Sequence, residues 1–131
     1  MSPPLLYGKI ESDQDPISEE VIKMIKIVLF CSTGLSTNLL IRKMENAAEG
    51  KDIEISVQSY PESLMKKYIK DADVVLVGPQ VKHAITEIKE ECDQHKVPLE
   101  VISTRDYGYM DGEKVLNQAL RLFSLHKEHK E

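Results

Sequence analysis

Residues 25 to 38 of the chain read Ile25-Lys26-Ile27-Val28-Leu29-Phe30-Cys31-Ser32-Thr33-Gly34-Leu35-Ser36-Thr37-Asn38. Five of the six residues before Cys31 are apolar, which is typical of a strand buried on both faces in a parallel sheet. A loop rich in hydroxyl groups follows, and apolar residues then recur at helical spacing over 39–48, with Ser36 or Thr37 as the N-cap. We therefore expect a strand, a loop and a helix in this order, with Cys31 at the carboxyl end of the strand.

The loop after Cys31 has the features of an anion-binding site. A helix N-terminus presents free backbone N–H groups and a positive dipole end, and in this arrangement both point back at the sulfur. The anion is either the thiolate of Cys31, whose pKa such a helix end lowers, or a bound phosphoryl group. Glycine permits close approach of a ligand, and hydroxyl groups donate to anionic oxygens. The candidate phosphoryl-binding loop comprises Ser32, Thr33, Gly34, Leu35, Ser36 and Thr37. The alternative for Cys31 is a buried apolar filler.

Short apolar runs and helical patterns alternate along the rest of the chain. Strands are expected at 53–57, 74–77 and 99–102, and helices over 61–70, over 81–92 and after Asp111-Gly112. This alternation predicts an α/β fold with one domain, whose four-stranded parallel sheet has strand order 2-1-3-4 and helices on both faces. Ligands of such sheets bind beyond the carboxyl ends of the strands, where the order of connection reverses. In the predicted topology Cys31 lies there, beside Gly78, Pro79 and Gln80.

Length, charge and cysteine content exclude several classes of protein. The chain has 131 residues, enough for one domain, and a formal charge of −5, which argues against nucleic acid as the main partner. It has no signal peptide and no apolar run long enough for direct membrane insertion, so we expect a cytoplasmic protein. Cys31 and Cys92 belong to no C-x-x-C or metal-ligand pattern, so we expect free thiols, no metal and no cofactor.

Composition divides the chain into three parts. Residues 1–23 contain three prolines and carry a net charge of −3, and we expect them to form a flexible N-terminal extension. Residues 24–126 hold all the predicted strands and helices and form the folded domain. Residues 127–131 are expected to be a polar C-terminal tail.

Three chemical roles fit a cysteine in this kind of loop: a phosphatase nucleophile, a phosphoryl carrier, or a member of a passive anion-binding module. Cysteine phosphatases use C-x5-R-[ST], in which the arginine binds phosphate and stabilises the transition state, and here Thr37 takes the arginine position. A phosphatase also needs a general acid, for which Asp106 is a candidate, although capping or a turn explains that residue equally well. Without a cation in the loop, a phosphoryl group on Cys31 would be held by neutral dipoles, which suits storage and onward transfer.

A series of segments occurs in this chain in a fixed order. They are Leu29–Leu40 with Met44, Tyr60-Pro61-Glu62, Asp73–Gln80, Tyr107-Gly108 and Asp111-Gly112. In this combination, over about residues 25–124, the chain resembles the enzyme IIB component of the bacterial phosphoenolpyruvate-dependent sugar phosphotransferase system, lactose/cellobiose family. The loop is similar to that of the cellobiose and chitobiose branch.

The resemblance implies that Cys31 accepts a phosphoryl group from a phosphohistidine on the IIA component. It passes the group to a sugar, expected to be a β-linked disaccharide, during uptake by the membrane-embedded IIC component. Residues 24–126 would be a IIB-like phosphocarrier domain whose architecture resembles low-molecular-weight tyrosine phosphatases. The cytoplasmic protein would be recruited to the inner face of the plasma membrane through IIC. Candidate rim or partner-contact residues are Tyr60, Gly78, Pro79, Gln80 and Tyr107.

Overall fold

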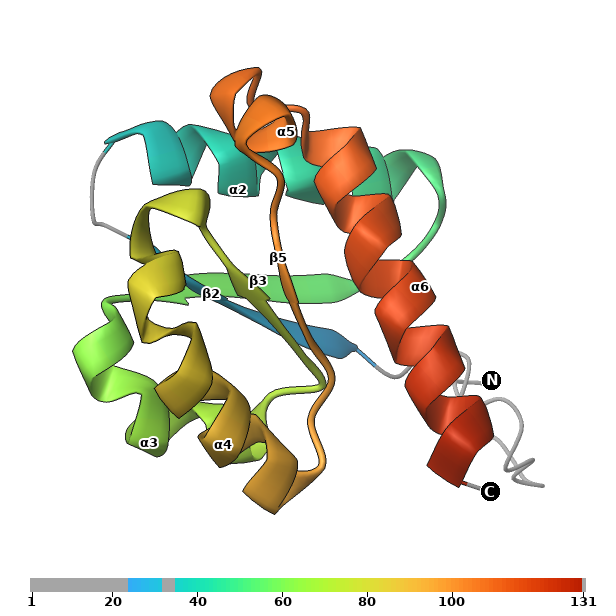
Figure 1. The fold of residues 1–131 in the computed structure, drawn as a ribbon. Helices are drawn as coiled ribbons and strands as arrows, with labels where there is room; N and C mark the ends of the chain where they lie inside the picture. The colour runs from blue at the N-terminus through green and yellow to red at the C-terminus, as the bar shows by residue number, and fades with distance from the viewer. Residues whose placement is uncertain (1–23, 32–34, 131) are drawn as a thin grey trace, which may run out of the picture.

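The computed structural model of the chain describes residues 24–31 and 35–130 (Figure 1). Its sheet has four parallel strands in the order β3-β2-β4-β5. The strands are β2 (Ile25–Phe30), β3 (Ile55–Tyr60), β4 (Val74–Val77) and β5 (Leu99–Val101). Numbered along the chain this order is 2-1-3-4, so the predicted sheet is confirmed. The register pairs Phe30 with both Tyr60 and Val77, which brings the carboxyl ends of three strands to one edge.

Helices follow every strand and cover both faces of the sheet. They are α2 (Leu35–Gly50), the run η1 (Glu62–Leu64), α3 (Met65–Tyr68) and η2 (Ile69–Asp71), then η3 (Pro79–Ala84) with α4 (Ile85–His95), and finally α5 (Thr104–Gly108) and α6 (Gly112–Lys130). In Figure 1, α2 and α6 lie on one face, and α3 and α4 lie on the other. None of the helices among the described residues is long and apolar enough to cross a membrane.

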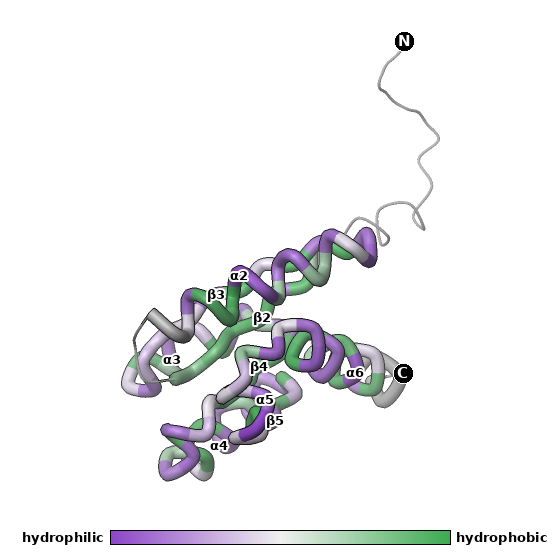
Figure 2. The backbone as a smooth tube through the Cα atoms, turned by 90° about the horizontal axis from the view of Figure 1, so that it is seen from above, coloured by the Kyte–Doolittle hydropathy of each residue, from purple (hydrophilic) through white to green (hydrophobic). Residues whose placement is uncertain are grey.

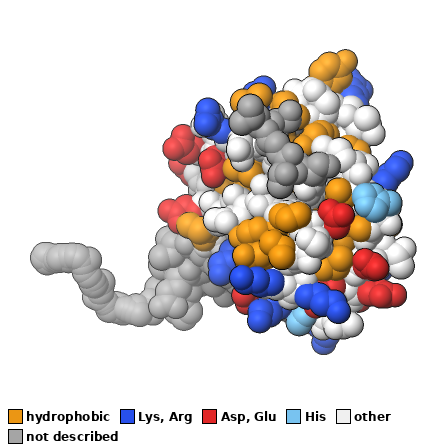
Figure 3. Space-filling view, turned by 90° about the vertical axis from the view of Figure 1, so that its left-hand side faces the viewer, with side chains coloured by type: hydrophobic (Ala, Val, Ile, Leu, Met, Phe, Trp, Pro, Cys, Tyr) orange, Lys and Arg blue, Asp and Glu red, His pale blue; other side chains and the backbone are white. Residues whose placement is uncertain are grey.

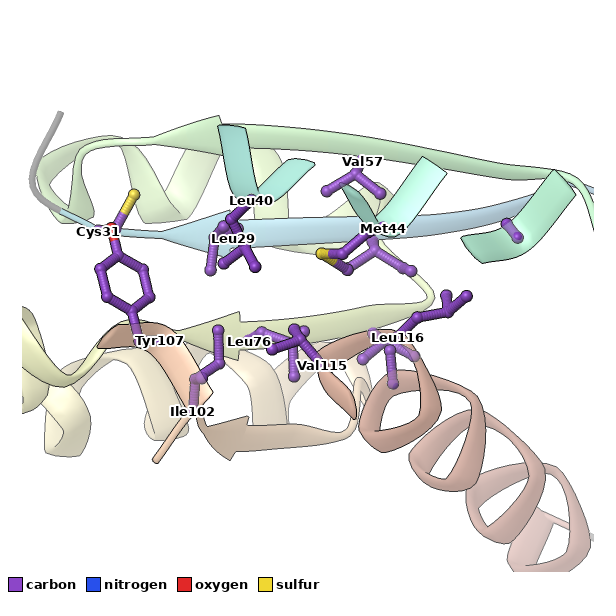
Figure 4. Close-up of a cluster of buried hydrophobic side chains, with 14 residues drawn as sticks. Leu29, Cys31, Leu40, Met44, Val57, Leu76, Ile102, Tyr107, Val115 and Leu116 are labelled. Carbon is purple, nitrogen blue, oxygen red and sulfur yellow. The ribbon is translucent and has the colours of Figure 1, made fainter. Parts of the chain in front are cut away.

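The core consists of two clusters, one on each face, because alternate residues of a strand point to opposite sides. Ile27, Leu29 and Cys31 of β2 and its end belong to the cluster under α2 and α6 (Figure 4). Val28 and Phe30 belong to the cluster under α3 and α4. Figure 2 shows the apolar strands in the middle and hydrophilic residues on the outer sides of the helices. β2 is therefore buried on both faces, as its apolar run predicts.

The predicted helix over 61–70 is a run of three short helical pieces. Leu64, with φ of −100° and ψ of 15°, lies outside the α-helical region, and the run changes from α-helix to 3-10 helix at Ile69. Its apolar face survives, because Met65 and Ile69, four residues apart, are both buried.

Two further helix boundaries differ from the sequence prediction. The short helix α5 was not expected, and Ser103 caps it by accepting a hydrogen bond from the Asp106 backbone N–H at 3.0 Å. Helix α6 continues through 127–130, the region predicted as a polar tail, because no glycine or proline after Gly112 ends it. Glu131 lies outside the described residues.

Candidate functional site

Cys31 follows β2 directly, at the edge where three strands end. Its backbone N–H donates to the carbonyl of Tyr60 at 3.3 Å. On the other side, the Gly78 N–H donates to the carbonyl of Phe30 at 2.8 Å. The cysteine is thus fixed between the ends of β3 and β4, as the predicted topology requires.

The side chain of Cys31 is 1% exposed and takes part in a buried series of hydrogen bonds. Its Sγ lies 3.2 Å from Oγ1 of Thr37, in the first turn of α2. The same Oγ1 lies 2.9 Å from the phenolic oxygen of Tyr107, in α5. Figure 4 shows Tyr107 reaching from its helix to the end of β2 beside Cys31. A thiol, a hydroxyl and a phenol from three elements therefore meet at one point.

Burial and hydrogen bonding act in opposite directions on the thiol. Burial raises the pKa of Cys31 above its ordinary value of 9.0, and the hydrogen bond with Thr37 lowers it by less. The net direction is opposite to the lowered pKa expected from the helix N-terminus. A helix N-terminus favours the thiolate, whereas burial removes water from around the sulfur and favours the neutral thiol. The sequence pattern predicts the helix N-terminus but not the extent of burial. In this conformation the thiol is protonated at neutral pH.

Of the predicted loop, only part falls within the described residues. Ser32, Thr33 and Gly34 lie outside them, and Leu35 and Ser36 are described only as the first residues of α2. The helix begins at Leu35, before the predicted cap at Ser36 or Thr37. Thr37 therefore lies inside the first turn, where its hydroxyl faces the sulfur.

Of the five candidate rim residues, Tyr60 and Gly78 adjoin Cys31 at the strand ends, Pro79 and Gln80 follow Gly78 in the chain, and Tyr107 is interior. Gly78 is buried, and a Cβ there would lie 3.1 Å from Cβ of Cys31 and would collide with the side chain of Gln80. Pro79 is half-buried and begins η3, and Gln80 is exposed. Tyr107 is only 8% exposed, so it forms an inner wall of the site instead of its rim.

Tyr60 is held by its own neighbours. Its ring stacks on Tyr68 with centroids 3.6 Å apart, and its hydroxyl donates to Oε1 of Gln58 at 2.9 Å. Its backbone carbonyl is the group that contacts Cys31. Nε2 of His83 lies 3.6 Å from Oε2 of Glu62, a contact that brings η3 beside η1 beyond this edge.

The residues needed for a phosphatase are not assembled among the described residues. Thr37, at the position of the phosphatase arginine, contributes a neutral hydroxyl, and Arg42 is exposed on α2. The backbone N–H of Asp106 binds the cap of α5, which supports the capping interpretation of this residue. The hydrogen bond between Tyr107 and Thr37 was not predicted from the sequence. Ser103, three residues before Asp106, is a capping-box signal that predicts the helix on which Tyr107 lies.

The face around the site exposes apolar side chains. Figure 3 views this end of the molecule and shows hydrophobic side chains gathered at its centre with charged ones around them. Exposed large apolar residues occur in elements that leave this edge of the sheet, namely Leu39 in α2, Leu64 in η1 and Tyr109 after α5. An apolar centre with a charged rim is typical of a surface that binds other proteins.

Comparison with known protein families decides the family of the chain. Residues 26–118 match the family model described as "PTS system, Lactose/Cellobiose specific IIB subunit". The chain belongs to this IIB family of the sugar phosphotransferase system. It is therefore a sugar phosphotransferase component, and its resemblance to the family is confirmed.

The IIB relatives share the domain but differ in their sugars. The oligo-beta-mannoside-specific EIIB component of Bacillus subtilis (strain 168) is 39% identical over 99 residues, which are 76% of this chain and 96% of that protein. The galactose-specific EIIB component of Lactococcus lactis subsp. cremoris (strain MG1363) is 40% identical over 103 residues, 75% of this chain and 95% of that protein.

Solved IIB structures have the same fold. The cellobiose-specific IIB component of Borrelia burgdorferi superposes with a TM-score of 0.69 at 33% identity, covering 79% of this chain and 95% of that one. The lactose-specific IIB domain of Streptococcus pneumoniae also gives a TM-score of 0.69, at 16% identity, covering 77% and 99%. About a quarter of this chain thus lies outside the part shared with its IIB relatives.

Proposed function

We propose that this IIB protein carries a phosphoryl group on Cys31 between a IIA phosphohistidine and a sugar bound by a IIC membrane transporter. The contact between the Cys31 sulfur and the Thr37 hydroxyl at the carboxyl edge of the sheet supports this most directly. It places beside the sulfur a neutral hydroxyl that can donate to a thiolate, with no positive charge in that contact. The proposed location is the cytoplasm, at the inner face of the plasma membrane when IIC is engaged.

The first transfer moves the phosphoryl group from nitrogen to sulfur. Sγ attacks phosphorus, the bond between phosphorus and the imidazole nitrogen breaks, and the new bond joins phosphorus to sulfur. The thiol proton leaves Cys31 and ends on the imidazole nitrogen, which receives the electron pair of the broken bond. Because burial raises the pKa of the Cys31 thiol, the sulfur must lose its proton when the partner binds, and the imidazole is the base that receives it.

The second transfer moves the group from sulfur to oxygen. A sugar hydroxyl attacks phosphorus, the phosphorus–sulfur bond breaks, and the proton of the hydroxyl restores the thiol. The hydrogen bond from Thr37 stabilises the departing thiolate. We propose a β-linked disaccharide as the sugar, because the loop is similar to that of the cellobiose branch.

Access to the sulfur requires a local opening of the groups around it. Cys31 is almost fully covered, so an in-line attack needs displacement of the groups around it. The exposed apolar side chains Leu39, Leu64 and Tyr109 give IIA and IIC a surface on which to bind in turn. Covering the thiol between these encounters also keeps water from a phosphoryl group carried there.

A phosphatase and a non-covalent anion-binding module are the alternatives. Phosphorylated IIA mixed with the protein should add one phosphoryl group to its intact mass. Cys31→Ser should abolish this gain, and the matched control Cys92→Ser should retain it. No mass gain in the wild type would favour the binding module. Rapid hydrolysis of an aryl phosphate that is lost in Cys31→Ser would favour the phosphatase.

A further inference from the structure

A groove runs along the outer edge of β5, the last strand of the sheet. Its volume is about 970 Å³, and it is lined by α4, by the turn that joins α4 to β5, by β5 itself and by His126 of α6. Figure 1 shows β5 passing between α4 and α6, so the two helices form the walls and the strand edge forms the floor. The groove lies far along the sheet order from β3 and is separate from the site at Cys31.

The floor of this groove has main-chain groups available for another strand. The Val75 N–H donates to the Pro98 carbonyl at 2.9 Å, and the Ile102 N–H donates to the Val77 carbonyl at 2.8 Å. In a parallel sheet, every second residue of a strand forms hydrogen bonds with the same neighbouring strand. Pro98 and Ile102 bond β4, so the residues one position away from them in β5 point their backbone N–H and carbonyl groups away from β4.

These outward-pointing residues are Leu99 and Val101. The Val101 carbonyl accepts a bond from Nε2 of Gln118 at 3.3 Å. The N–H and carbonyl of Leu99 and the N–H of Val101 have no protein partner in the part of the chain that the structure describes. An uncovered row of such groups is a template for an added strand.

Some side chains of the groove also lack a hydrogen-bond or ion-pair partner among the described residues. Nε2 of His126 is buried and has no hydrogen bond among residues 24–31 and 35–130. Lys89 is paired with Asp93 at 3.2 Å, and Glu100 lies 3.5 Å from Arg121. Lys96, exposed at the end of α4, has no ion pair among the described residues. The uncompensated charge of the groove is therefore positive and lies where β5 begins.

We propose that residues 6–10 of this chain bind in the groove as a fifth strand, antiparallel to β5. In a strand Leu6, Gly8 and Ile10 would share one face, and Tyr7 and Lys9 would share the other. A single antiparallel edge strand is a common addition to a parallel sheet. The IIB relatives cover only 75% to 76% of this chain, so the added strand would be a feature of its extra segment.

Reach and charge fix the direction of the added strand. Met24 lies just before β2, and the groove edge is three strand spacings away, roughly 14 Å. The linker of residues 11–23 extends to about 43 Å, so it covers this span with slack. An antiparallel strand ends at the same sheet edge where β2 begins, and no crossing of the sheet is needed. It also brings the acidic residues Glu11, Asp13 and Asp15 to Lys96.

Amide hydrogen exchange of the full-length protein, followed residue by residue by NMR, tests the proposal. Two added main-chain hydrogen bonds predict exchange at Leu99 and Val101 that is roughly tenfold slower, or more, than in Ile10→Pro. Proline at position 10 cannot donate to the sheet. The matched control Ser18→Pro, in the linker, should keep the slow exchange. Lys96→Glu should speed exchange at both amides, and Lys82→Glu, on η3, should not.

Three results would overturn the proposal. Exchange at Leu99 and Val101 that is as fast in the wild type as in Ile10→Pro would mean that the groove is empty. Slow exchange that survives Ile10→Pro would mean that another group covers the edge. Slow exchange that is lost on dilution would identify a second copy of the chain as the occupant.

Discussion

The phenol of Tyr107 supports the cysteine through Thr37, and removing one oxygen atom tests this. When the sulfur is a thiolate it can only accept, so Thr37 must donate to Sγ and Tyr107 must donate to Thr37. The variant Tyr107→Phe keeps the ring in the core and deletes the 2.9 Å contact between the two oxygens. We expect a loss of unfolding free energy of about 1 kcal/mol, the net worth of one buried neutral hydrogen bond.

The same substitution should slow phosphoryl acceptance. If the lost contact mainly stabilised the anionic sulfur, about 1 kcal/mol corresponds to roughly a fivefold lower rate. The pKa of Cys31 should rise further, because a weaker hydrogen bond leaves burial less opposed. Urea unfolding measures the free energy of unfolding, and iodoacetamide labelling at a series of pH values measures the pKa of the Cys31 thiol. Single-turnover transfer from phosphorylated IIA measures the rate of phosphoryl acceptance.

Tyr68→Phe is the matched control, because it keeps the ring that stacks on Tyr60 and removes a hydroxyl that forms no hydrogen bond among the described residues. It should leave stability, thiol reactivity and transfer rate unchanged. If Tyr107→Phe behaves like Tyr68→Phe in all three measurements, the hydrogen-bonded series contributes nothing.

Three other predictions concern the thiols and the packing of the helices. Thr37→Val should slow transfer and raise the pKa of Cys31 in labelling experiments, and Thr37→Ser should restore both; equal defects in the two variants would point to packing instead of the hydroxyl. Gly112→Ala should cost about 2 kcal/mol in urea unfolding, because its Cβ would lie 2.7 Å from the Met44 nitrogen, whereas Gly108→Ala, with open space around it, should be tolerated. Burial, with nearby acids, raises the pKa of Cys92 to about 12 from an ordinary 9.0. The unfolded chain then loses this proton first, so unfolding free energy should fall by up to about 1.4 kcal/mol per pH unit between those values, and Cys92→Ala should flatten that slope.

The strand order follows from the sequence because burial differs between strands. β4 is wholly apolar and β2 is apolar except for Lys26, so both are expected in the middle, whereas β3 alternates and tolerates an edge. The connection order then reverses between β2 and β4, and Cys31 ends the first of them. The position of the candidate nucleophile could thus be predicted from pattern alone.

The surroundings of Cys31 could not be predicted in the same way. The approach of Tyr107 to Thr37 joins residues 70 positions apart through a helix of five residues, which has no periodicity of its own. The direction of the pKa depends on how completely the core encloses the sulfur, and that is a property of the packed domain. The local sequence predicts a helix N-terminus, which would lower the pKa of Cys31, but not the burial that raises it.

The proposed function requires a covalent bond between phosphorus and the sulfur of Cys31. Phosphorus NMR of the protein after incubation with phosphorylated IIA tests this bond directly, because phosphorus bound to sulfur, nitrogen or oxygen resonates at different positions. We expect one thiophosphate-type signal that is absent in Cys31→Ser, is retained in Cys92→Ser and disappears when IIC and its sugar are added. A spectrum that shows only the phosphohistidine of IIA, with no signal from phosphorus bound to sulfur, would contradict the proposed function.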